Sequence, residues 1–465
     1  SPRCWGATVA KEFMHEGWFF PDEDPDMQWR LEPHGADRSV PDGGETYVRF
    51  ELKKPEQVEV IQVRHSGPGQ QYYHNLELNA DYTVEFWLRG EGAEGSVLVA
   101  DNLYKHVRAQ FTPTKEWKKH KYVFRLSKYG GDKDISLLQL LITGPGTFCV
   151  DGFKVYRSDV PFMDLLPHDY AALRESGMMA LRTHALIKTE QYTYTMDQLT
   201  NPAGQTHLGS GHSVPQMLGI IKKAGVRPWL QIEWHMWPDE WLGLVEYLAA
   251  PYDPAVDTPA SKPWAFKRHS QGQTRPWTDE FDRIYMELSN ENWNFMFRPW
   301  VFVPATDSAT GKEYKAGEVY GMLQEHVCQV WAKSPYWKSA GLEDKIIWMV
   351  GGGCGRSFGH DAMSHSPNSD YQTENGYIGG WERNEGPPSV EPRTFFSQMN
   401  QASQVTMKEI AQSWGYRKRV VEATGRPLYP LGIYEGGPGY AHPRIQRPGL
   451  TLTAQAFEDQ EYVMK

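Results

Sequence analysis

The chain has 465 residues, a length sufficient for two or three domains with sizeable hydrophobic cores. Its formal net charge of -10 argues against nucleic acid or an anionic membrane surface as a partner. No apolar run approaches the length of a membrane-spanning helix, so we expect no membrane span. The 18 Trp and 24 Tyr residues suit either a large core or platforms on which sugar rings stack.

The cysteines and histidines give no sign of a metal or cofactor site. The cysteines show no CxxC pair and no zinc spacing; they are Cys4, Cys149, Cys328 and Cys354. The histidines form no HExxH set. We therefore expect no cofactor and no catalytic metal, and we expect isolated thiols, with the pairing of Cys4 left open.

The first third of the chain is dominated by short β-strands. Apolar and polar residues alternate in Thr83–Leu88 and Tyr122–Leu126, and Gly/Pro turns separate the strands. The predicted strands are Tyr47–Leu52, Gln57–Val63, Tyr82–Leu88, Ser96–Ala100, Lys121–Leu126, Ile135–Ile142 and Thr147–Tyr156. Short strands at close spacing with such turns predict an antiparallel β-sandwich over residues 1–158.

From residue 159 onward, strands and helices alternate, as in βα units around a parallel sheet. The predicted strands are Met178–His184, Arg227–His235, a third that ends at Glu246-Tyr247, Arg283–Asn290, Lys345–Gly351, Glu374–Gly380 and Leu428–Glu435. The predicted helices are Ser213–Gly225, Thr394–Gly415 and Thr451–Lys465. This pattern predicts a (β/α)8 TIM barrel over residues 159–465 whose last strand is not visible in this chain.

An open doubly wound sheet is the structural rival to the barrel. A doubly wound sheet that binds a dinucleotide has a Gly-rich phosphate loop after its first strand. The first predicted strand instead ends in Arg182-Thr-His184, without Gly-x-Gly. Dinucleotide binding is therefore not expected.

Two predicted strands end in carboxyl groups. The strand that starts at Arg283 breaks into the polar tip Ser289-Asn290-Glu291-Asn292, and the last strand ends in Glu435 before a Gly-rich bend. Two carboxylates at the C-terminal ends of barrel strands are what a glycosidase needs. In a retaining enzyme they lie about 5–5.5 Å apart, and one is the nucleophile while the other is the acid and base.

The N-terminal stretch resembles the jelly-roll carbohydrate-binding modules. The likeness rests on the order of the strands and on the final segment Gly146–Tyr156, which carries an apolar-Asp-apolar edge. It covers roughly residues 16–157. The resemblance implies either a sugar binder or a brace for a catalytic domain, and we expect bracing first.

The C-terminal stretch resembles the clan A retaining glycoside hydrolases. Asn290-Glu291 after the fourth predicted strand and Glu435 after the seventh carry the likeness, which is closest to the family 51 and family 39 branches. Those branches hold arabinofuranosidases, xylosidases and some endoglycanases. The resemblance implies Glu291 as acid/base, Glu435 as nucleophile and Asn290 as the partner of the sugar 2-hydroxyl.

Further candidates for substrate binding surround these three. Trp293 follows Glu291 closely, and Tyr377 matches the place where the clan often has a Tyr bonded to the nucleophile. Glu233 and His235 end the second predicted strand and either line the cleft or form a structural salt bridge. Arg182 and His184 stand where family 51 has Arg-x-Pro-Gly-Gly, so we expect a different glycone pocket.

Together these features predict a secreted or periplasmic retaining glycoside hydrolase that acts on a polysaccharide or its oligosaccharides. The alternative is a non-catalytic glycan-binding protein that uses the same cleft. Leu450–Lys465 has the pattern of a seventh helix that leads into an eighth strand. We expect that strand from residues beyond Lys465 or from a second polypeptide, with the segment Ser1–Gly44 as a weaker source.

Overall fold

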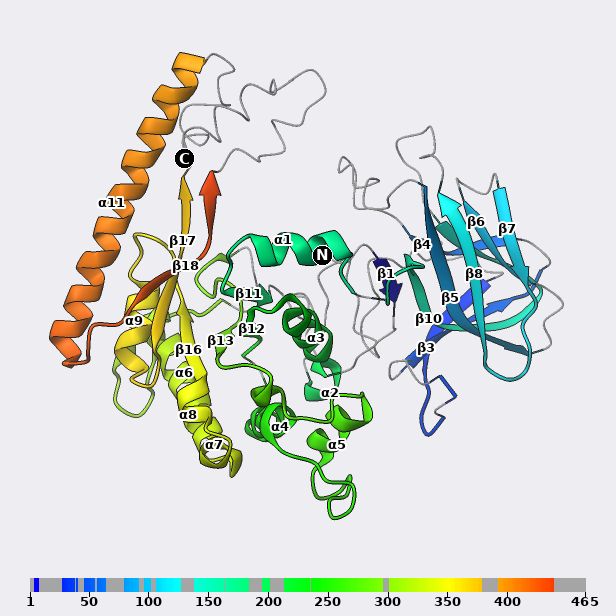
Figure 1. Cartoon of the computed structure of the whole chain (residues 1–465), viewed down its shortest axis with the longest axis horizontal. Coiled ribbons are helices and arrows are strands. Elements are labelled where there is room, and N and C mark those ends of the chain that lie inside the picture. The colour runs from blue at the N-terminus through cyan, green and yellow to red at the C-terminus, as the bar shows by residue number, and fades with distance from the viewer. Residues whose placement is uncertain are drawn as a thin grey trace. The chain divides into compact units, whose positions relative to one another are not determined.

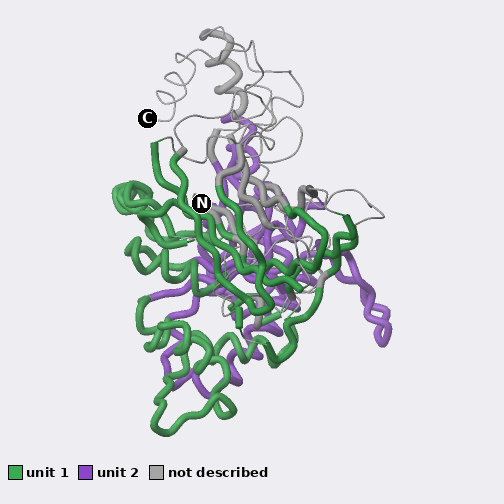
Figure 2. Tube along the Cα trace, turned by 90° about the vertical axis from the view of Figure 1, so that its right-hand side faces the viewer, with its two compact units in different colours: residues 1–228, 235–282 green, residues 229–234, 283–465 purple. Residues whose placement is uncertain are grey.

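The computed structural model describes residues 4–7, 27–37, 39–40, 46–54, 57–63, 79–91, 96–101, 106–126, 138–162, 164–183, 195–200, 213–234, 236–295, 301–378 and 392–438. The chain divides into two compact units (Figure 2). One comprises Ser1–Pro228 and His235–Asp282, and the other comprises Trp229–Trp234 and Arg283–Lys465. Among the described residues, no helix is long and apolar enough to cross a membrane.

The N-terminal region forms two antiparallel sheets, as the sequence predicts (Figure 1). The first has the order β2 (Met27–Pro33), β3 (Thr46–Leu52), β10 (Gly146–Arg157), β5 (Ala80–Glu91), β8 (Lys118–Leu126), with β1 (Cys4–Ala7) paired to β10. The second has the order β4 (Gln57–Val63), β9 (Leu138–Thr143), β6 (Ser96–Asp101), β7 (His106–Phe111). The rings of Phe86 on β5 and Phe111 on β7 lie 5.4 Å apart and join the two sheets.

A period of two in burial is visible in β3 and in the second half of β5, whereas residues 82–86 of β5 and 148–151 of β10 are buried without interruption. Val48 and Phe50 of β3, Leu88 of β5, and Phe148 and Val150 of β10 are fully buried. Residues between them, such as Arg49 and Arg89, are partly exposed. Where a buried and a solvated face alternate, the sequence pattern predicted the antiparallel strands.

After β10 the first unit becomes helical. Its elements are α1 (Pro167–Glu175), β11 (Ala180–Thr183), α2 (Met196–Leu199), α3 (Val214–Ala224), α4 (Pro238–Ala249), α5 (Pro263–Ser270) and the short η2 (Trp277–Asp279). The predicted helix Ser213–Gly225 is confirmed as α3. Its first turn is fixed because the Ser213 amide donates to Gln216 Oε1 at 3.1 Å, and it ends at Gly225, which has a φ of 74°.

The predicted third strand ending at Glu246-Tyr247 is wrong, because this segment belongs to helix α4. Trp241, Leu244, Val245 and Leu248 are buried at helical spacing. Glu246 does not end a strand. Its Oε1 accepts hydrogen bonds from the amides of Trp264 at 2.8 Å and Ala265 at 3.0 Å, at the start of α5.

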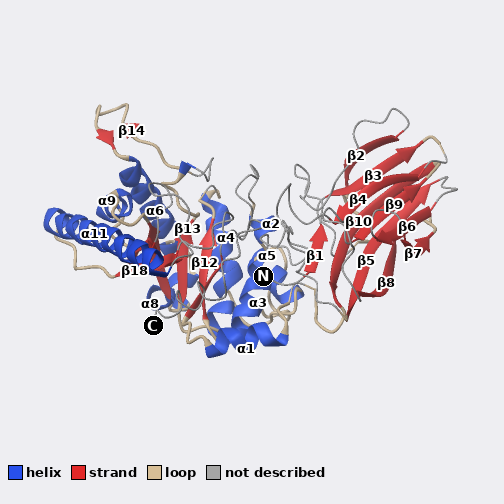
Figure 3. Ribbon diagram, turned by 90° about the horizontal axis from the view of Figure 1, so that it is seen from above, coloured by secondary structure: helices blue, strands red, loops and turns tan. Residues whose placement is uncertain are grey.

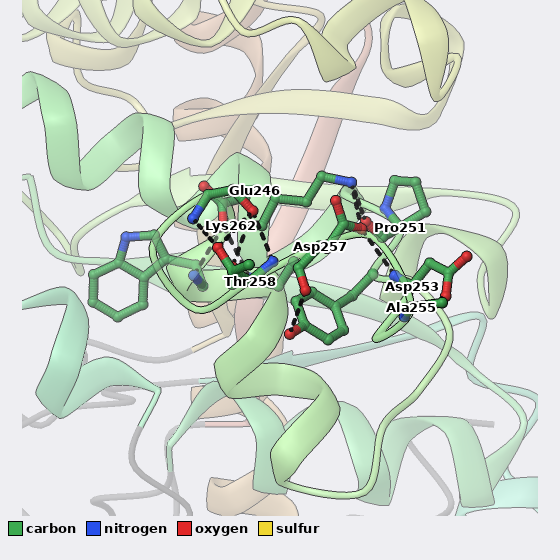
Figure 4. A network of polar contacts seen from close by, with 11 residues as sticks. Glu246, Pro251, Asp253, Ala255, Asp257, Thr258 and Lys262 are labelled. Carbon is green, nitrogen blue, oxygen red and sulfur yellow. Dashed lines mark hydrogen bonds and ion pairs between the residues drawn. The ribbon is translucent and has the colours of Figure 1, made fainter.

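The loop between α4 and α5 is held by a network of polar contacts around Glu246 and Asp257 (Figure 4). Lys262 Nζ lies 2.9 Å from both the Pro251 carbonyl and Asp257 Oδ2. The Asp253 amide donates to the same Asp257 oxygen at 2.8 Å. Glu246 and Asp257 thus fix the helix start and the loop before it, and neither is presented for chemistry.

The second unit is built on a parallel sheet of order β12 (Arg227–Ile232), β13 (Ile284–Leu288), β16 (Ile346–Gly351), β17 (Tyr371–Ile378), β18 (Leu431–Pro438). Every pairing along this order is parallel, which confirms the expected βα architecture. β16 is buried along its whole length. In Figure 3, strands and helices alternate here, whereas the N-terminal sheets consist of strands only.

Helices pack against this sheet and against one another. They are α6 (Ala316–Ala332), α7 (Tyr336–Ser339), α8 (Leu342–Lys345), α9 (Phe358–His365) and α11 (Pro392–Thr424), and a small hairpin is formed by β14 (Ala305–Thr306) and β15 (Glu313–Tyr314). Trp331 of α6 packs on Trp348 of β16 with ring centroids 5.1 Å apart. The predicted helix Thr394–Gly415 is confirmed as part of α11, and the predicted helix Thr451–Lys465 lies outside the described residues.

Candidate active site

The polar tip after β13 has an unusual backbone. Ser289 has a φ of 57° and Glu291 a φ of 45°, both in the left-handed region that non-glycine residues rarely occupy. Ser289, Asn290, Glu291 and Asn292 are all buried. Such a conformation costs on the order of 1–3 kcal/mol per residue and persists only where the surroundings fix it, most often at functional sites.

Hydrogen bonds within the tip provide part of that fixation. Asn292 Nδ2 donates to the Leu288 carbonyl at 2.8 Å and so closes the turn onto the end of β13. The Asn294 amide donates to the Glu291 carbonyl at 2.7 Å. The Phe302 amide donates to the Asn292 carbonyl at 3.0 Å, and the Phe302 ring lies 5.3 Å from that of Trp234. The tip is therefore held by β13 before it and by the segment around Phe302 after it.

Both carboxylate oxygens of Glu291 accept hydrogen bonds. Tyr434 donates its hydroxyl to Oε1 at 2.7 Å, and Asn294 Nδ2 donates to Oε2 at 2.7 Å. Tyr434 belongs to β18, and β16 and β17 lie between β18 and β13 in the sheet. Three strand spacings correspond to roughly 14 Å in a flat sheet, so this contact requires the sheet to curve toward the face that carries both side chains.

A bulge in β18 decides where its catalytic candidate lies. Ile433 pairs with Glu374 and Glu435 pairs with Asn375, so Tyr434 is the extra residue. A bulge interrupts the alternation of side chains between the two faces of a strand. Glu435 is half-buried and directly follows the residue whose hydroxyl reaches Glu291. The two carboxyl groups predicted from sequence thus come from the tip after β13 and from β18, and one hydrogen bond links these two segments. The prediction that the last strand ends at Glu435 is wrong, because the residues from Gly436 to Pro438 also pair with β17 and extend β18 to Pro438.

Glu233 follows β12 directly and is only 2% exposed. Its carboxyl group is hydrogen-bonded by Ser289. The pKa of Glu233 is raised to about 7, mainly by burial; the Ser289 hydrogen bond opposes this shift, and the nearby charge of Glu287 adds to it. Glu287 is itself buried and accepts a hydrogen bond from Trp229 Nε1 at 2.8 Å.

The other predicted site residues lie in different settings. Trp293 is half-buried, and the Arg356 guanidinium lies 4.4 Å from its ring centroid. Tyr377 is 40% exposed near the end of β17, and its carbonyl accepts a hydrogen bond from Thr406 of α11 at 3.0 Å. Arg182 is half-buried on β11 in the first unit. His184 and His235 lie outside the described residues. The substrate-binding roles of these residues stay predictions.

A buried network supports the strand that carries Asn375 and Tyr377. Glu374 Oε1 lies 3.0 Å from His360 Nε2 on α9, and Glu374 Oε2 accepts a hydrogen bond from Ser413 of α11 at 2.7 Å. His360 Nδ1 lies 2.9 Å from the Tyr429 hydroxyl just before β18. This network joins β17 to both covering helices. In the part of the chain that the structure describes, no group of three His, Cys, Asp or Glu residues could hold a metal ion.

Sequence reasoning missed Tyr434, Asn294 and Ser289. Tyr434 and Ser289 lie beside predicted catalytic residues in the two strand-end motifs, so their positions were visible, but their partners were not. The distance of 143 residues between Tyr434 and Glu291 leaves no local pattern that could pair them.

Comparison with known proteins gives matches to solved structures alone: no family model and no curated protein matches this chain. An arabinose-bound family 51 α-L-arabinofuranosidase matches with 11% identity over 91% of this chain and 68% of that chain, with a TM-score of 0.46. The family 51 α-L-arabinofuranosidase of Bifidobacterium longum matches with 15% identity over 58% of this chain and 50% of that chain, with a TM-score of 0.40.

A third match has a carbohydrate-binding module as well as a catalytic one. The family 22 and family 10 modules of a Clostridium thermocellum endo-1,4-β-D-xylanase match with 8% identity over 89% of this chain and 87% of that chain, with a TM-score of 0.28. All three TM-scores lie below 0.5, and this chain spans half of the Bifidobacterium longum enzyme, so the matches alone carry no activity or substrate.

Proposed function

We propose that this chain is a retaining glycoside hydrolase that cleaves the glycosidic bonds of a polysaccharide or its oligosaccharides by double displacement. The supporting observation is the hydrogen bond of 2.7 Å between Tyr434 and Glu291. It ties β18, which carries Glu435, to the tip after β13, where Glu291 lies. Two carboxyl groups that face one substrate are the minimum that this reaction requires.

In the proposed first step, a Glu435 oxygen attacks the anomeric carbon. The bond between that carbon and the leaving oxygen breaks, and Glu291 gives its proton to that oxygen, so an ester to Glu435 forms and the alcohol leaves. In the second step, Glu291 takes a proton from water, whose oxygen attacks the anomeric carbon. The ester bond breaks, Glu435 is released as a carboxylate, and the product keeps the starting anomeric configuration.

The surrounding residues receive roles that follow from their positions. Tyr434 and Asn294 fix the two oxygens of Glu291 and so limit the directions in which its proton can be delivered. Asn290 is proposed to bond the sugar 2-hydroxyl, and Trp293 and Tyr377 to flank the sugar. Arg356, on the ring of Trp293, would lie at the edge of this site.

The proposal extends to the fold and the location of the protein. We propose that the parallel sheet belongs to a (β/α)8 barrel, because the contact between Tyr434 and Glu291 requires a strongly curved sheet. The two antiparallel sheets before it would form a jelly roll that braces the catalytic domain, with the boundary near residue 158. A secreted or periplasmic location fits a polysaccharide substrate.

Turnover of aryl glycosides tests the proposal. Purified protein is incubated with a panel of aryl arabinofuranosides, xylosides and glucosides, and Glu435→Gln should abolish turnover of any that react. Azide should restore the rate of Glu291→Ala on a substrate with a good leaving group, since the anion replaces the water that the base activates. A product of inverted configuration, detected by proton NMR in the first turnovers, would overturn the retaining mechanism. Saturable glycan binding without turnover would favour the non-catalytic alternative.

A further inference from the structure

Ser289 is the residue at which the backbone leaves β13 and turns into the tip. Its φ of 57° places it in the left-handed region, two residues before the second such residue, Glu291. Its amide donates to the Ile232 carbonyl at 2.8 Å, and its hydroxyl oxygen accepts a hydrogen bond from the Trp234 amide at 3.2 Å. The turn that carries Glu291 is therefore anchored on the end of the neighbouring strand β12.

Glu233 lies between these two anchor points. Ile232 pairs with Leu288 in the parallel register, so the next residues, Glu233 and Ser289, lie side by side. The Ser289 hydroxyl donates its proton to the Glu233 carboxyl group while it accepts from the Trp234 amide. Both hydrogen-bonding capacities of the hydroxyl are thus engaged, which fixes its rotamer as well as the backbone around it.

We propose that Glu233 is a positioning residue for Glu291, which acts through the Ser289 hydroxyl to hold the left-handed turn in the geometry needed for proton transfer. The inference rests on the proposed function of Glu291 as acid and base. Glu233 is buried, with 2% of its surface exposed, and in this proposal its effect on Glu291 is transmitted through the turn.

The choice of an acidic residue at this position supports such a role. Glu287, one step back on the same face of β13, is a second buried carboxyl group. Packing alone would favour apolar side chains here, because two acidic groups in one buried layer disfavour each other's charge. A carboxyl oxygen, however, accepts a hydrogen bond from a serine hydroxyl, which an apolar side chain cannot do.

Two substrates of the same sugar separate positioning from stability. The 2,4-dinitrophenolate group leaves a glycoside without protonation. The 4-methylphenolate group, in contrast, needs the proton of Glu291 in order to leave. Glu233→Ala should lower kcat/KM for the methylphenyl substrate by about 100-fold and for the dinitrophenyl substrate by at most about threefold, because a small displacement of the acid affects only the step that uses it. Ser289→Ala should give the same split, and Glu233→Gln, which still accepts the hydrogen bond, should recover most of the loss.

The control is Glu374→Ala, which removes a buried carboxyl group of the same unit that is remote from the tip in sequence. It should lower kcat/KM equally on both substrates, in proportion to the folded fraction. If Glu233→Ala does not fold, Ser289→Ala decides, since it removes only one oxygen. An equal loss on both substrates, or no loss, in the folded variants overturns the positioning role. If Glu291→Ala itself shows no split between the substrates, the proposed function fails instead.

Discussion

The Tyr434 hydroxyl donates a hydrogen bond of 2.7 Å to Glu291 Oε1, across 143 residues of sequence. The two residues come from β18 and from the tip after β13, which two intervening strands separate in the sheet. Since Asn294 holds the other oxygen of Glu291, this carboxyl group has a fixed plane and a fixed direction. Such fixation is what proton transfer along a single path requires.

Tyr434→Phe should lower kcat by about 10- to 100-fold, because a hydrogen bond to a charged group contributes about 1.5–3 kcal/mol. Steady-state kinetics on an aryl glycoside measures the effect, and denaturant unfolding should show a change of less than about 1 kcal/mol, since the Tyr434 side chain is only half-buried. Tyr314→Phe on the small hairpin is the matched control and should keep wild-type kinetics. A wild-type kcat for Tyr434→Phe would contradict the orienting role.

The left-handed backbone at Glu291 gives a prediction about stability. Glu291→Gly and Glu291→Ala both remove the carboxyl group, but only glycine occupies a φ of 45° without strain. The glycine variant should therefore be more stable than the alanine variant by about 0.5–1 kcal/mol, after allowance for its greater entropy when unfolded. Urea unfolding of the two inactive variants measures the difference. Equal stability would show that the turn is not strained.

The stability of the protein should depend on pH through Glu233. Burial raises the pKa of Glu233 to about 7 from its ordinary value of 4.5, so the folded chain keeps a proton that the unfolded chain releases between these values. The contribution of this group is therefore fully present below pH 4.5 and is lost as the pH rises through 7. A shift of this size corresponds to roughly 3 kcal/mol.

Glu233→Gln, which cannot ionise, removes this dependence. Between pH 5 and pH 8, the free energy of unfolding should decrease in both proteins. The decrease should be smaller in Glu233→Gln than in the wild type, by roughly 2–3 kcal/mol. Urea unfolding at the two pH values provides the comparison, and the exposed Glu343→Gln serves as the control that keeps the wild-type difference. The same pH dependence in Glu233→Gln and wild type would count against a buried, neutral Glu233.

Helices α6 and α9 approach closely at Gly321. A Cβ atom at this position would lie 2.8 Å from the Ala362 Cα and would clash with the Ala362 carbonyl oxygen. Gly321→Ala should therefore destabilise the protein by about 1–3 kcal/mol, although alanine favours helices. In contrast, Gly219→Ala in α3, where a Cβ meets nothing within 4 Å, should stabilise it by up to about 1 kcal/mol. Calorimetric melting of both variants checks the opposite signs.

Local sequence patterns identified the elements whose burial follows a simple period. The alternation in Ile284–Leu288 predicted β13, and the polar residues that follow it could not continue a buried strand, so they predicted the tip. The helix Ser213–Gly225 was predicted because its start and stop signals lie within the segment. The position of Glu291 just after a strand also follows from such local signals, whereas β18 continues past Glu435 to Pro438 because it still pairs with β17 there.

The segment Trp241–Tyr247 shows where local pattern failed. A short apolar run fits a buried strand or one face of a helix equally well, and neighbours outside the run decide between them. Here the decision came from Trp264 and Ala265, whose amides use Glu246 as their acceptor and so hold it on a helix. The same carboxyl group that suggested a strand end is part of the start of the next helix.

The sequence by itself determined that Glu291 follows a strand and that Glu435 belongs to one, because strand and turn signals act over a few residues. Only the tertiary structure decided how those groups are held. The hydrogen bond from Tyr434 to Glu291 depends on sheet curvature and on a bulge, and the link from Glu233 through Ser289 depends on the register between two strands. Curvature, bulge and register are set by packing between segments far apart in the chain, and no local pattern encodes them.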